Sequence, residues 1–139
     1  SVQSSTLQAL IDQRKKILMK SHAVQQQAQE RCDETAQLCE QLRRLAPTPL
    51  AVGSRISAAG LRSNAKFHAR LQGALVAAEE RRAELEKSLR QATQTCQARA
   101  RAVQALATLA NRRQAAVTSA ELQREQGLCD EHAVLRHAR

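Results

Sequence analysis

The sequence contains almost no aromatic residues. Phe67 is the only one among 139 residues, and tryptophan and tyrosine are absent. Because aromatic side chains supply a large share of the area buried in globular cores, this absence argues against a compact, multilayered core. No apolar run is long enough to span a bilayer, and no charged-then-apolar signal peptide opens the chain. The abundance of alanine, leucine, arginine, glutamine and glutamate is instead typical of long helices and coiled coils.

Sequence signals for catalysis or metal binding are equally scarce. The stretch from Gly53 to Gly60 lacks the spacing and the Lys-Ser/Thr ending of a phosphate-binding loop. Cys129, His132 and His137 have short, metal-like spacing, but a helix turns His137 away and no fourth ligand is evident. We therefore expect no catalytic residue, metal or cofactor. The four cysteines are interpreted as free thiols that act as small apolar residues.

The formal net charge of +9 favours association with acidic surfaces. The basic residues are interpreted as spread along the chain and interleaved with acidic ones, as in the segment from Glu79 to Arg82. No stacking aromatics accompany them, so nucleic-acid binding is the less favoured alternative.

Apolar residues recur every seven positions on both sides of a single break that contains Pro47, Pro49 and Gly53. Sustained spacing of this kind keeps one stripe of a helix facing a partner helix. It predicts an all-α fold in which two long helices form an antiparallel coiled-coil hairpin, the second helix being longer than the first. Before the break the main series is Leu10, Ile17, Val24, Leu38 and Leu45, with Arg31 as its polar exception, and a companion series holds Leu7, Ala28 and Leu42. After the break one series is Leu71, Ala78, Leu85, Ala92 and Leu106, and its partner is Leu75, Leu89, Cys96, Val103, Ala110 and Val117.

The break sets the expected boundaries of a single hairpin over residues 1–139. Helix one is expected at about residues 6–46, capped by Thr6, the loop at about 47–57, and helix two at about 58–137, capped by Ser57 or Ser63. A turn near residue 52 would make the numbers of facing residues add to about 105, so that Cys96 would lie near Ala9. Pairing would then end near residue 100, leaving an exposed apolar stripe that needs a partner. Arginines on the stripes, such as Arg14, Arg82 and Arg113, are expected to cover it with their stems while their guanidinium groups reach solvent.

Three short motifs occur in a fixed order along the predicted second helix. They are Asn-x-x-Phe-x-x-x-Leu at Asn64, Phe67 and Leu71, the Ala-Leu-Ala-Thr run at 105–108, and the tail residues Arg124, Glu125, Gln126, Asp130, Glu131, Ala133 and Arg136. In this order the chain resembles the export-ATPase stalk family of type III secretion systems, the flagellar FliJ and injectisome YscO proteins. The resemblance implies a non-enzymatic cytoplasmic subunit, peripheral to the inner-membrane export apparatus and monomeric alone. Its implied partners are a hexameric secretion ATPase, the cytosolic domain of the export gate protein and substrate chaperones, without nucleic acid or direct membrane insertion.

The resemblance also assigns two sets of contact residues by position. Those facing the export gate are Leu42, Leu45, Phe67, Leu71, Ala74 and Ala78, and those facing the ATPase are Arg124, Glu125, Asp130, Glu131 and Arg136. The chain lacks the Tyr and Trp that flagellar members carry near the hairpin tip, which makes an injectisome member at least as well supported as a flagellar one. Two alternatives remain open at this stage, a homodimeric coiled-coil scaffold and a basic hairpin that binds nucleic acid.

Overall fold

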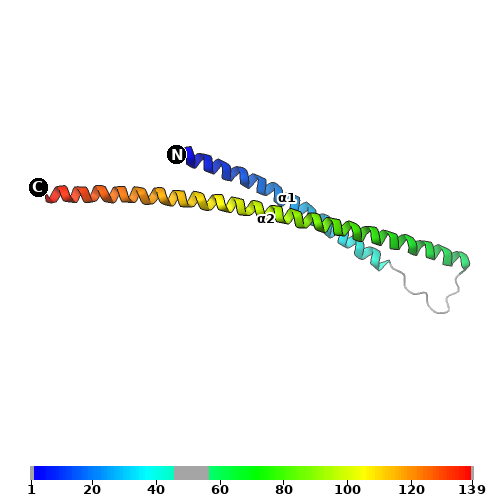
Figure 1. Ribbon diagram of the computed structural model, residues 1–139. Coiled ribbons are helices and arrows are strands. Elements are labelled where there is room, and N and C mark those ends of the chain that lie inside the picture. The colour runs from blue at the N-terminus through cyan, green and yellow to red at the C-terminus, as the bar shows by residue number, and fades with distance from the viewer. Residues whose placement is uncertain (1, 46–56, 139) are drawn as a thin grey trace. The chain divides into compact units, whose positions relative to one another are not determined.

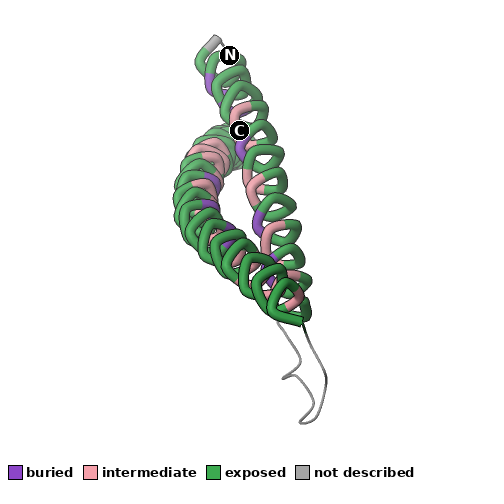
Figure 2. Tube along the Cα trace, turned by 90° about the vertical axis from the view of Figure 1, so that its right-hand side faces the viewer, coloured by how far each residue is buried: buried purple, intermediate pink, exposed green. Residues whose placement is uncertain are grey.

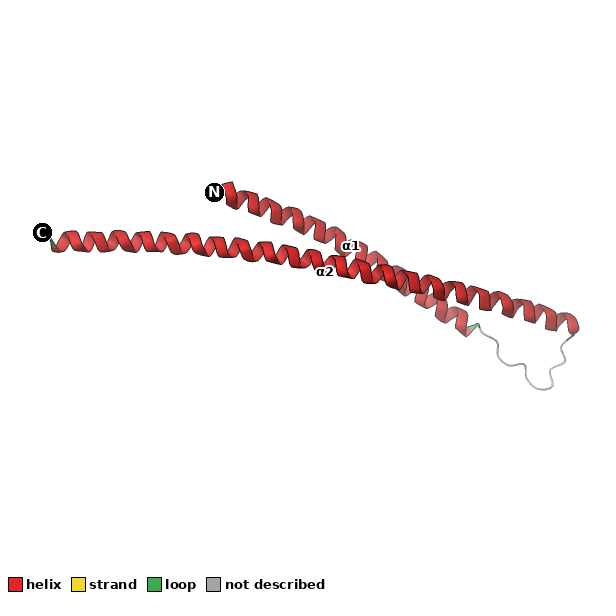
Figure 3. Cartoon of the chain, viewed as in Figure 1, coloured by secondary structure: helices red, strands yellow, loops and turns green. Residues whose placement is uncertain are grey.

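The computed structural model describes residues 2–45 and 57–138 and is helical almost throughout them. Helix α1 spans Val2–Arg44 and helix α2 spans Ala58–His137, and no strand occurs in these two ranges (Figures 1 and 3). The predicted all-α fold with a longer second helix is therefore confirmed. α1 begins before Thr6, because neither glycine nor proline interrupts its first turn. Residues 46–56, which include both prolines and most of the predicted loop, lie outside the described part of the chain.

Ser57 caps the start of α2. Its Oγ atom accepts a hydrogen bond from the backbone N–H of Gly60 at 3.0 Å, and its carbonyl oxygen accepts one from the N–H of Leu61 at 3.0 Å. A serine oxygen bonded to the N–H three residues later satisfies one of the donors that a helix start leaves unpaired. Ser57, rather than the alternative Ser63, is the capping residue.

The helix pair divides into two compact units. Unit 1 consists of Ser1–Met19 together with Gln97–Arg139, and unit 2 consists of Lys20–Cys96. In each unit a segment of α1 packs against a segment of α2, and the buried positions lie on the helix sides that face each other (Figure 2).

Small side chains dominate the seam of unit 2, that is, the surface along which α1 and α2 contact each other. α1 buries Ser21, Cys32 and Cys39, and α2 buries Ala78, Leu85 and Cys96. Polar contacts join the same faces: Gln25 Nε2 donates to Thr93 Oγ1 at 3.2 Å, and Cys96 Sγ lies 3.2 Å from His22 Nδ1. All buried side-chain nitrogen and oxygen atoms in the described ranges have a hydrogen-bond partner. The seam of unit 2 is thus narrow, and its buried polar side-chain atoms are all hydrogen-bonded.

An ion pair marks the end of α1 in this unit. Arg43 Nη2 lies 2.9 Å from Glu79 Oε1, and this hydrogen bond raises the pKa of the Arg43 guanidinium above its ordinary value. The numbers of contacting residues add to 122 for this pair and to 118 for His22 with Cys96, so the predicted value near 105 is wrong. The prediction assumed a turn equally distant from both helices, whereas the first turns of α2 extend beyond the end of α1 (Figure 1). Cys96 therefore lies beside His22 and not near Ala9.

Unit 1 is held together by the first turns of α1. Leu7 and Ile11 are buried, and Val103, Leu106 and Ala110 of α2 are half-buried. Gln3 and Ser4 line a shallow surface with Gln114 and Val117, so pairing reaches Val117 rather than ending near residue 100. Beyond it α2 continues from Thr118 to His137 with every residue exposed, past the first residues of α1 (Figure 1).

The two predicted series of α2 are confirmed except for Val117, which is 52% exposed. In α1 the companion series through Leu7, Ala28 and Leu42 is confirmed, but the main series is wrong apart from the half-buried Ile17. Val24, Leu38 and Leu45 are 47–58% exposed, and Leu10 is at the edge of exposure. The seam uses instead the companion series through Leu7, Ser21, Ala28, Thr35 and Leu42, together with a second series through Ile11, Leu18, Gln25, Cys32 and Cys39. Six of these ten side chains are small or polar, namely Ser21, Gln25, Ala28, Cys32, Thr35 and Cys39, so apolar spacing alone ranked the neighbouring leucines and valines above them. Closely approaching helices favour small residues, and the larger ones lie at the flanks.

The stripe arginines behave as expected. Arg14, Arg31, Arg99 and Arg113 are exposed, and Arg82 is half-buried with its Nε atom 3.1 Å from Glu86 Oε1. Their guanidinium groups therefore remain close to solvent.

Candidate interaction surfaces

The six residues predicted to face the export gate all lie in unit 2, where the end of α1 meets the first third of α2. The structure separates them into two groups. Ala78 is buried, and Leu42 and Leu71 are half-buried, so these three help to pack the helices together. Leu45, Phe67 and Ala74 are exposed, and only these three present most of their side chain to a partner.

Phe67 is the most distinctive exposed residue of this group. It is 52% exposed, and its ring makes an edge contact with the imidazole of His68, with centroids 6.1 Å apart and planes inclined by 63°. An exposed aromatic ring carries a large apolar area for a future contact. Phe67 therefore lies on the surface of unit 2, and its contact with the export gate stays a prediction.

The five residues predicted to face the ATPase lie on the unpaired end of α2. Arg124, Glu125, Asp130, Glu131 and Arg136 are all exposed. Asp130 and Glu131 lie beside Val134 and Leu135 on one shallow apolar surface, where both apolar side chains are more than 60% exposed. Leu128 lies one heptad before Leu135 and shares its face of the helix. The tail thus combines charges of both signs with a partly apolar face.

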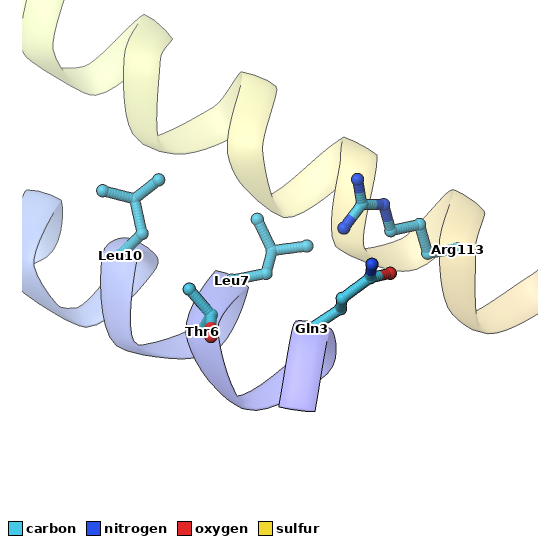
Figure 4. Close-up of a pocket in the computed structure, with 5 residues that line it drawn as sticks. All are labelled: Gln3, Thr6, Leu7, Leu10 and Arg113. Atoms are coloured by element: carbon cyan, nitrogen blue, oxygen red, sulfur yellow. The ribbon is translucent and has the colours of Figure 1, made fainter. Parts of the chain in front are cut away.

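A shallow groove in unit 1 was not predicted from the sequence. It lies where α1 begins, and it is lined by Gln3, Thr6, Leu7, Leu10 and Arg113 (Figure 4). Leu7 and Leu10 supply its apolar wall, and the stem of Arg113 reaches across from α2 (Figure 4). The groove is open to solvent, so it is suited to part of a protein surface rather than to an enclosed small molecule.

Charge is distributed unequally between the two units. Four ion pairs within the described residues lie between Glu40 and Glu86, in unit 2. α2 then carries no acidic residue from Lys87 to Ala120, a stretch with six basic ones. The expected interleaving of acidic and basic residues therefore holds for residues 20–86 of unit 2 and is wrong for residues 87–120. The sequence already shows this, because no acidic residue occurs between Glu86 and Glu121.

The cysteines and histidines do not gather into a metal site. Within residues 2–45 and 57–138, no group of three or more His, Cys, Asp or Glu side chains is placed to hold an ion. Cys129 is an exposed free thiol on the tail, and Cys32, Cys39 and Cys96 are buried free thiols, as predicted. Cys96 and His22 contact each other across the seam and so connect α2 with α1.

Neither described helix is apolar over enough of its length to cross a membrane.

These features define a class of protein: two unequal helices whose pairing leaves extended, mostly exposed surfaces for macromolecular partners. A family model described as flagellar FliJ protein matches residues 4–139. The chain therefore belongs to the FliJ family, whose members are components of flagellar protein export. This is the family that the three motifs resembled, and the match is to its flagellar branch. Comparison with curated proteins and with solved structures gave no significant match.

Proposed function

We propose that this chain is the stalk of a flagellar export ATPase, and that it links a hexameric secretion ATPase to the cytosolic domain of the export gate. The observation that carries the proposal is the continuation of α2, in a FliJ family member, from Thr118 to His137 without a facing segment of α1. At 1.5 Å per residue this end is about 30 Å long. An exposed helix of that length, with apolar residues on it, is expected to bind a partner.

The ATPase contact is assigned to this unpaired end. Arg124, Glu125, Asp130, Glu131 and Arg136 offer charges of both signs, and Leu128 and Leu135 offer a narrow apolar face. A single helix is about 10–12 Å in diameter, so it fits a narrow opening at the centre of a ring. Many weak polar contacts distributed along it would hold the helix without locking it in one orientation.

The export-gate contact is assigned to the other end of the helix pair. Leu45, Phe67 and Ala74 supply the exposed area, while Leu42, Leu71 and Ala78 hold the helices that present them. Phe67 is the expected centre of this contact, since aromatic residues dominate the energetics of most interfaces.

We further propose that the chain is a monomer alone, that it lies in the cytoplasm at the periphery of the inner-membrane export apparatus, and that it escorts substrate chaperones. Its exposed surfaces carry a net positive charge, which favours a dissolved monomer over self-association. The second candidate is that the chain links the ATPase to the export gate of an injectisome and so has a role in virulence. The family match favours the flagellar one.

The proposal is tested by mixing the purified chain with the hexameric secretion ATPase of the same export system. We expect the two to co-purify and the ATP turnover of the hexamer to rise. A chain that ends after Val117 keeps both paired segments and should lose the stimulation. The matched control is Phe67→Ala, which alters the opposite end and should stimulate the ATPase normally while losing affinity for the export gate domain.

Two results would refute this assignment. One is a lack of binding to the ATPase even at low salt, and the other is full stimulation by the chain that ends after Val117. Light scattering distinguishes the proposed monomer from the alternative, a homodimeric scaffold, because the dimer would have twice the mass.

A further inference from the structure

One side of the helix pair in unit 1 combines apolar residues with arginines. Leu10 of α1 and Arg113 of α2 line the same hollow near the start of α1 (Figure 4), so both belong to this side. Residues three, four or seven positions apart share a side of a helix. Arg14 and Ile17, four and seven positions after Leu10, therefore lie on the same side, as does Leu109, four positions before Arg113. We call this surface of five residues the arginine face.

The arginine face offers both charge and apolar area to a partner. Arg14 and Arg113 are exposed, Leu10 and Leu109 are 36% and 41% exposed, and Ile17 is half-buried. The apolar side chains thus lie beside the guanidinium groups rather than apart from them. Arginine stems cover apolar surface while their charged ends reach a polar layer. The face is therefore suited to a partner that is apolar just beneath a layer of negative charge.

The opposite side of α1 has a different chemistry. Gln8 and Asp12 lie two positions before and after Leu10, which places them about 200° around the helix from it. Gln8 Nε2 donates a hydrogen bond to Asp12 Oδ1 at 3.0 Å. Asp12 is the only acidic residue among residues 1–19 and 97–120. Within these two stretches, no carboxylate therefore opposes the positive charge on the side of the arginine face.

This one-sided arrangement selects among negatively charged partners. A specific protein interface buries about 800 Å² per partner, far more than the partly exposed side chains of Leu10, Ile17 and Leu109 supply. Two paired helices of 10–12 Å each are about 20 Å wide, so they do not fit the major groove of a duplex, which is about 12 Å wide. An anionic bilayer needs neither a large apolar patch nor a groove, because its headgroups attract arginines and its acyl boundary accepts leucines.

We infer that the arginine face is the surface through which the chain adsorbs to an anionic lipid bilayer. A bilayer is flat, so it contacts one side of α1 and of α2 at once, with the guanidinium groups at the headgroups and the leucines toward the acyl boundary. The inference rests on the proposed location at the inner membrane, and it adds the class of lipid and the residues that contact it. Both helices lie on the bilayer in this arrangement, and neither described helix is apolar enough to cross it.

The test compares two full-length variants that each remove two positive charges from unit 1. The face variant is Arg14→Gln with Arg113→Gln. The control variant is Lys16→Gln with Arg101→Gln, because Lys16 is six positions after Leu10 and Arg101 is twelve positions before Arg113, which places each about 120° around its helix from the face. Both variants keep the helical circular dichroism of the wild type, since all four side chains are exposed and glutamine favours the helix.

Binding is measured by co-sedimentation with phosphatidylcholine vesicles that contain or lack phosphatidylglycerol, over a series of salt concentrations. We expect the wild type to bind only the vesicles with phosphatidylglycerol. An arginine near an anionic surface contributes about a factor of five, so the face variant should bind roughly thirtyfold more weakly. The control variant should stay within about threefold of the wild type, because its charges lie about a Debye length farther from the lipid.

The apolar part of the face is tested separately. Leu109→Gln should weaken binding to the phosphatidylglycerol vesicles roughly threefold while leaving the salt dependence unchanged, because it removes apolar contact but no charge. The matched control is Leu122→Gln, which changes an exposed leucine on the unpaired end of α2 and should bind as the wild type does. Equal losses in these two variants would contradict the arginine face.

Three results would overturn the inference. They are a wild type that does not bind phosphatidylglycerol vesicles at physiological salt, equal losses in the face and control variants, and binding to duplex DNA or polyglutamate instead of vesicles that the face variant alone loses. The proposed function is judged by a different readout. A wild type that stimulates the ATPase but ignores the vesicles refutes only the lipid contact, and one that binds the vesicles without stimulating the ATPase refutes only the proposed stalk.

Discussion

The seam of unit 2 provides a direct test of which residues hold the helices together. Leu85 of α2 and Leu38 of α1 both lie on seven-residue series, but the structure places Leu85 in the seam and Leu38 outside it. Leu85 is 8% exposed and Leu38 is 47% exposed. Leu85→Ala and Leu38→Ala remove the same atoms in the same unit, so they form a matched pair.

The expected magnitudes follow from the unpaired end of α2. There Leu122 and Leu128 are 60% exposed, which is the exposure that a leucine keeps on a single helix. Packing lowers this fraction from 60% to 8% for Leu85 but only to 47% for Leu38. Three buried carbons are worth about 0.8 kcal/mol each, so Leu85→Ala should lower the free energy of unfolding by about 2 kcal/mol. Leu38→Ala should lower it by about 0.5 kcal/mol or less, because little area is lost and alanine favours the helix.

The free energy of unfolding is measured by urea denaturation, followed by circular dichroism of the helices. The reasoning is refuted if Leu38→Ala destabilises unit 2 as much as Leu85→Ala does. In that case the main apolar stripe of α1, and not the small-residue series, would form the seam.

Three further predictions concern separate parts of the chain. Ser57→Ala should cost about 1 kcal/mol at the start of α2, seen as faster amide exchange in its first turns, and unchanged exchange there would contradict the cap. Under native conditions Cys129 should react with an alkylating reagent while the buried thiols of Cys32, Cys39 and Cys96 react only after unfolding, and mass spectrometry would reveal any early labelling of the buried three. Gln25→Ala should lower the melting temperature, because it leaves the half-buried Thr93 hydroxyl without this donor, whereas Gln26→Ala at the neighbouring exposed position should not; equal melting temperatures would contradict the role of the Gln25–Thr93 bond.

Much of the fold was predictable because helix signals are strong and local. Few glycines or prolines interrupt the two segments, and the stripe through Leu71, Ala78, Leu85 and Cys96 has one unambiguous apolar face. The stripe of α1 was not predictable by the same rule. Cys32, Cys39 and Ser21 are weak hydrophobic signals, and yet they are the residues that a close helix contact can accommodate.

The register and the interaction surfaces depend on information that the pattern does not carry. Counting outward from a central turn cannot reveal that the first turns of α2 pass the end of α1, an offset that the contact between Arg43 and Glu79 shows. The candidate contact residues Phe67 and Arg124 lie on the surface, and their contacts with partners stay predictions. The basic stretch of α2 from Lys87 to Ala120 was missed because the charge was averaged over the chain rather than followed along each helix.

The small-residue seam of unit 2 also has a consequence for sliding between the helices. Side chains such as Ser21, Cys32 and Cys39 give little steric resistance to a shift of α1 by one heptad. Such a shift would bring Arg43 from Glu79 toward Glu86, which already pairs with Arg82, and it would separate His22 from Cys96 and Gln25 from Thr93. These two polar contacts therefore act as the register lock of the helix pair. A force that pulls α1 along α2 would therefore stretch the His22–Cys96 and Gln25–Thr93 contacts first.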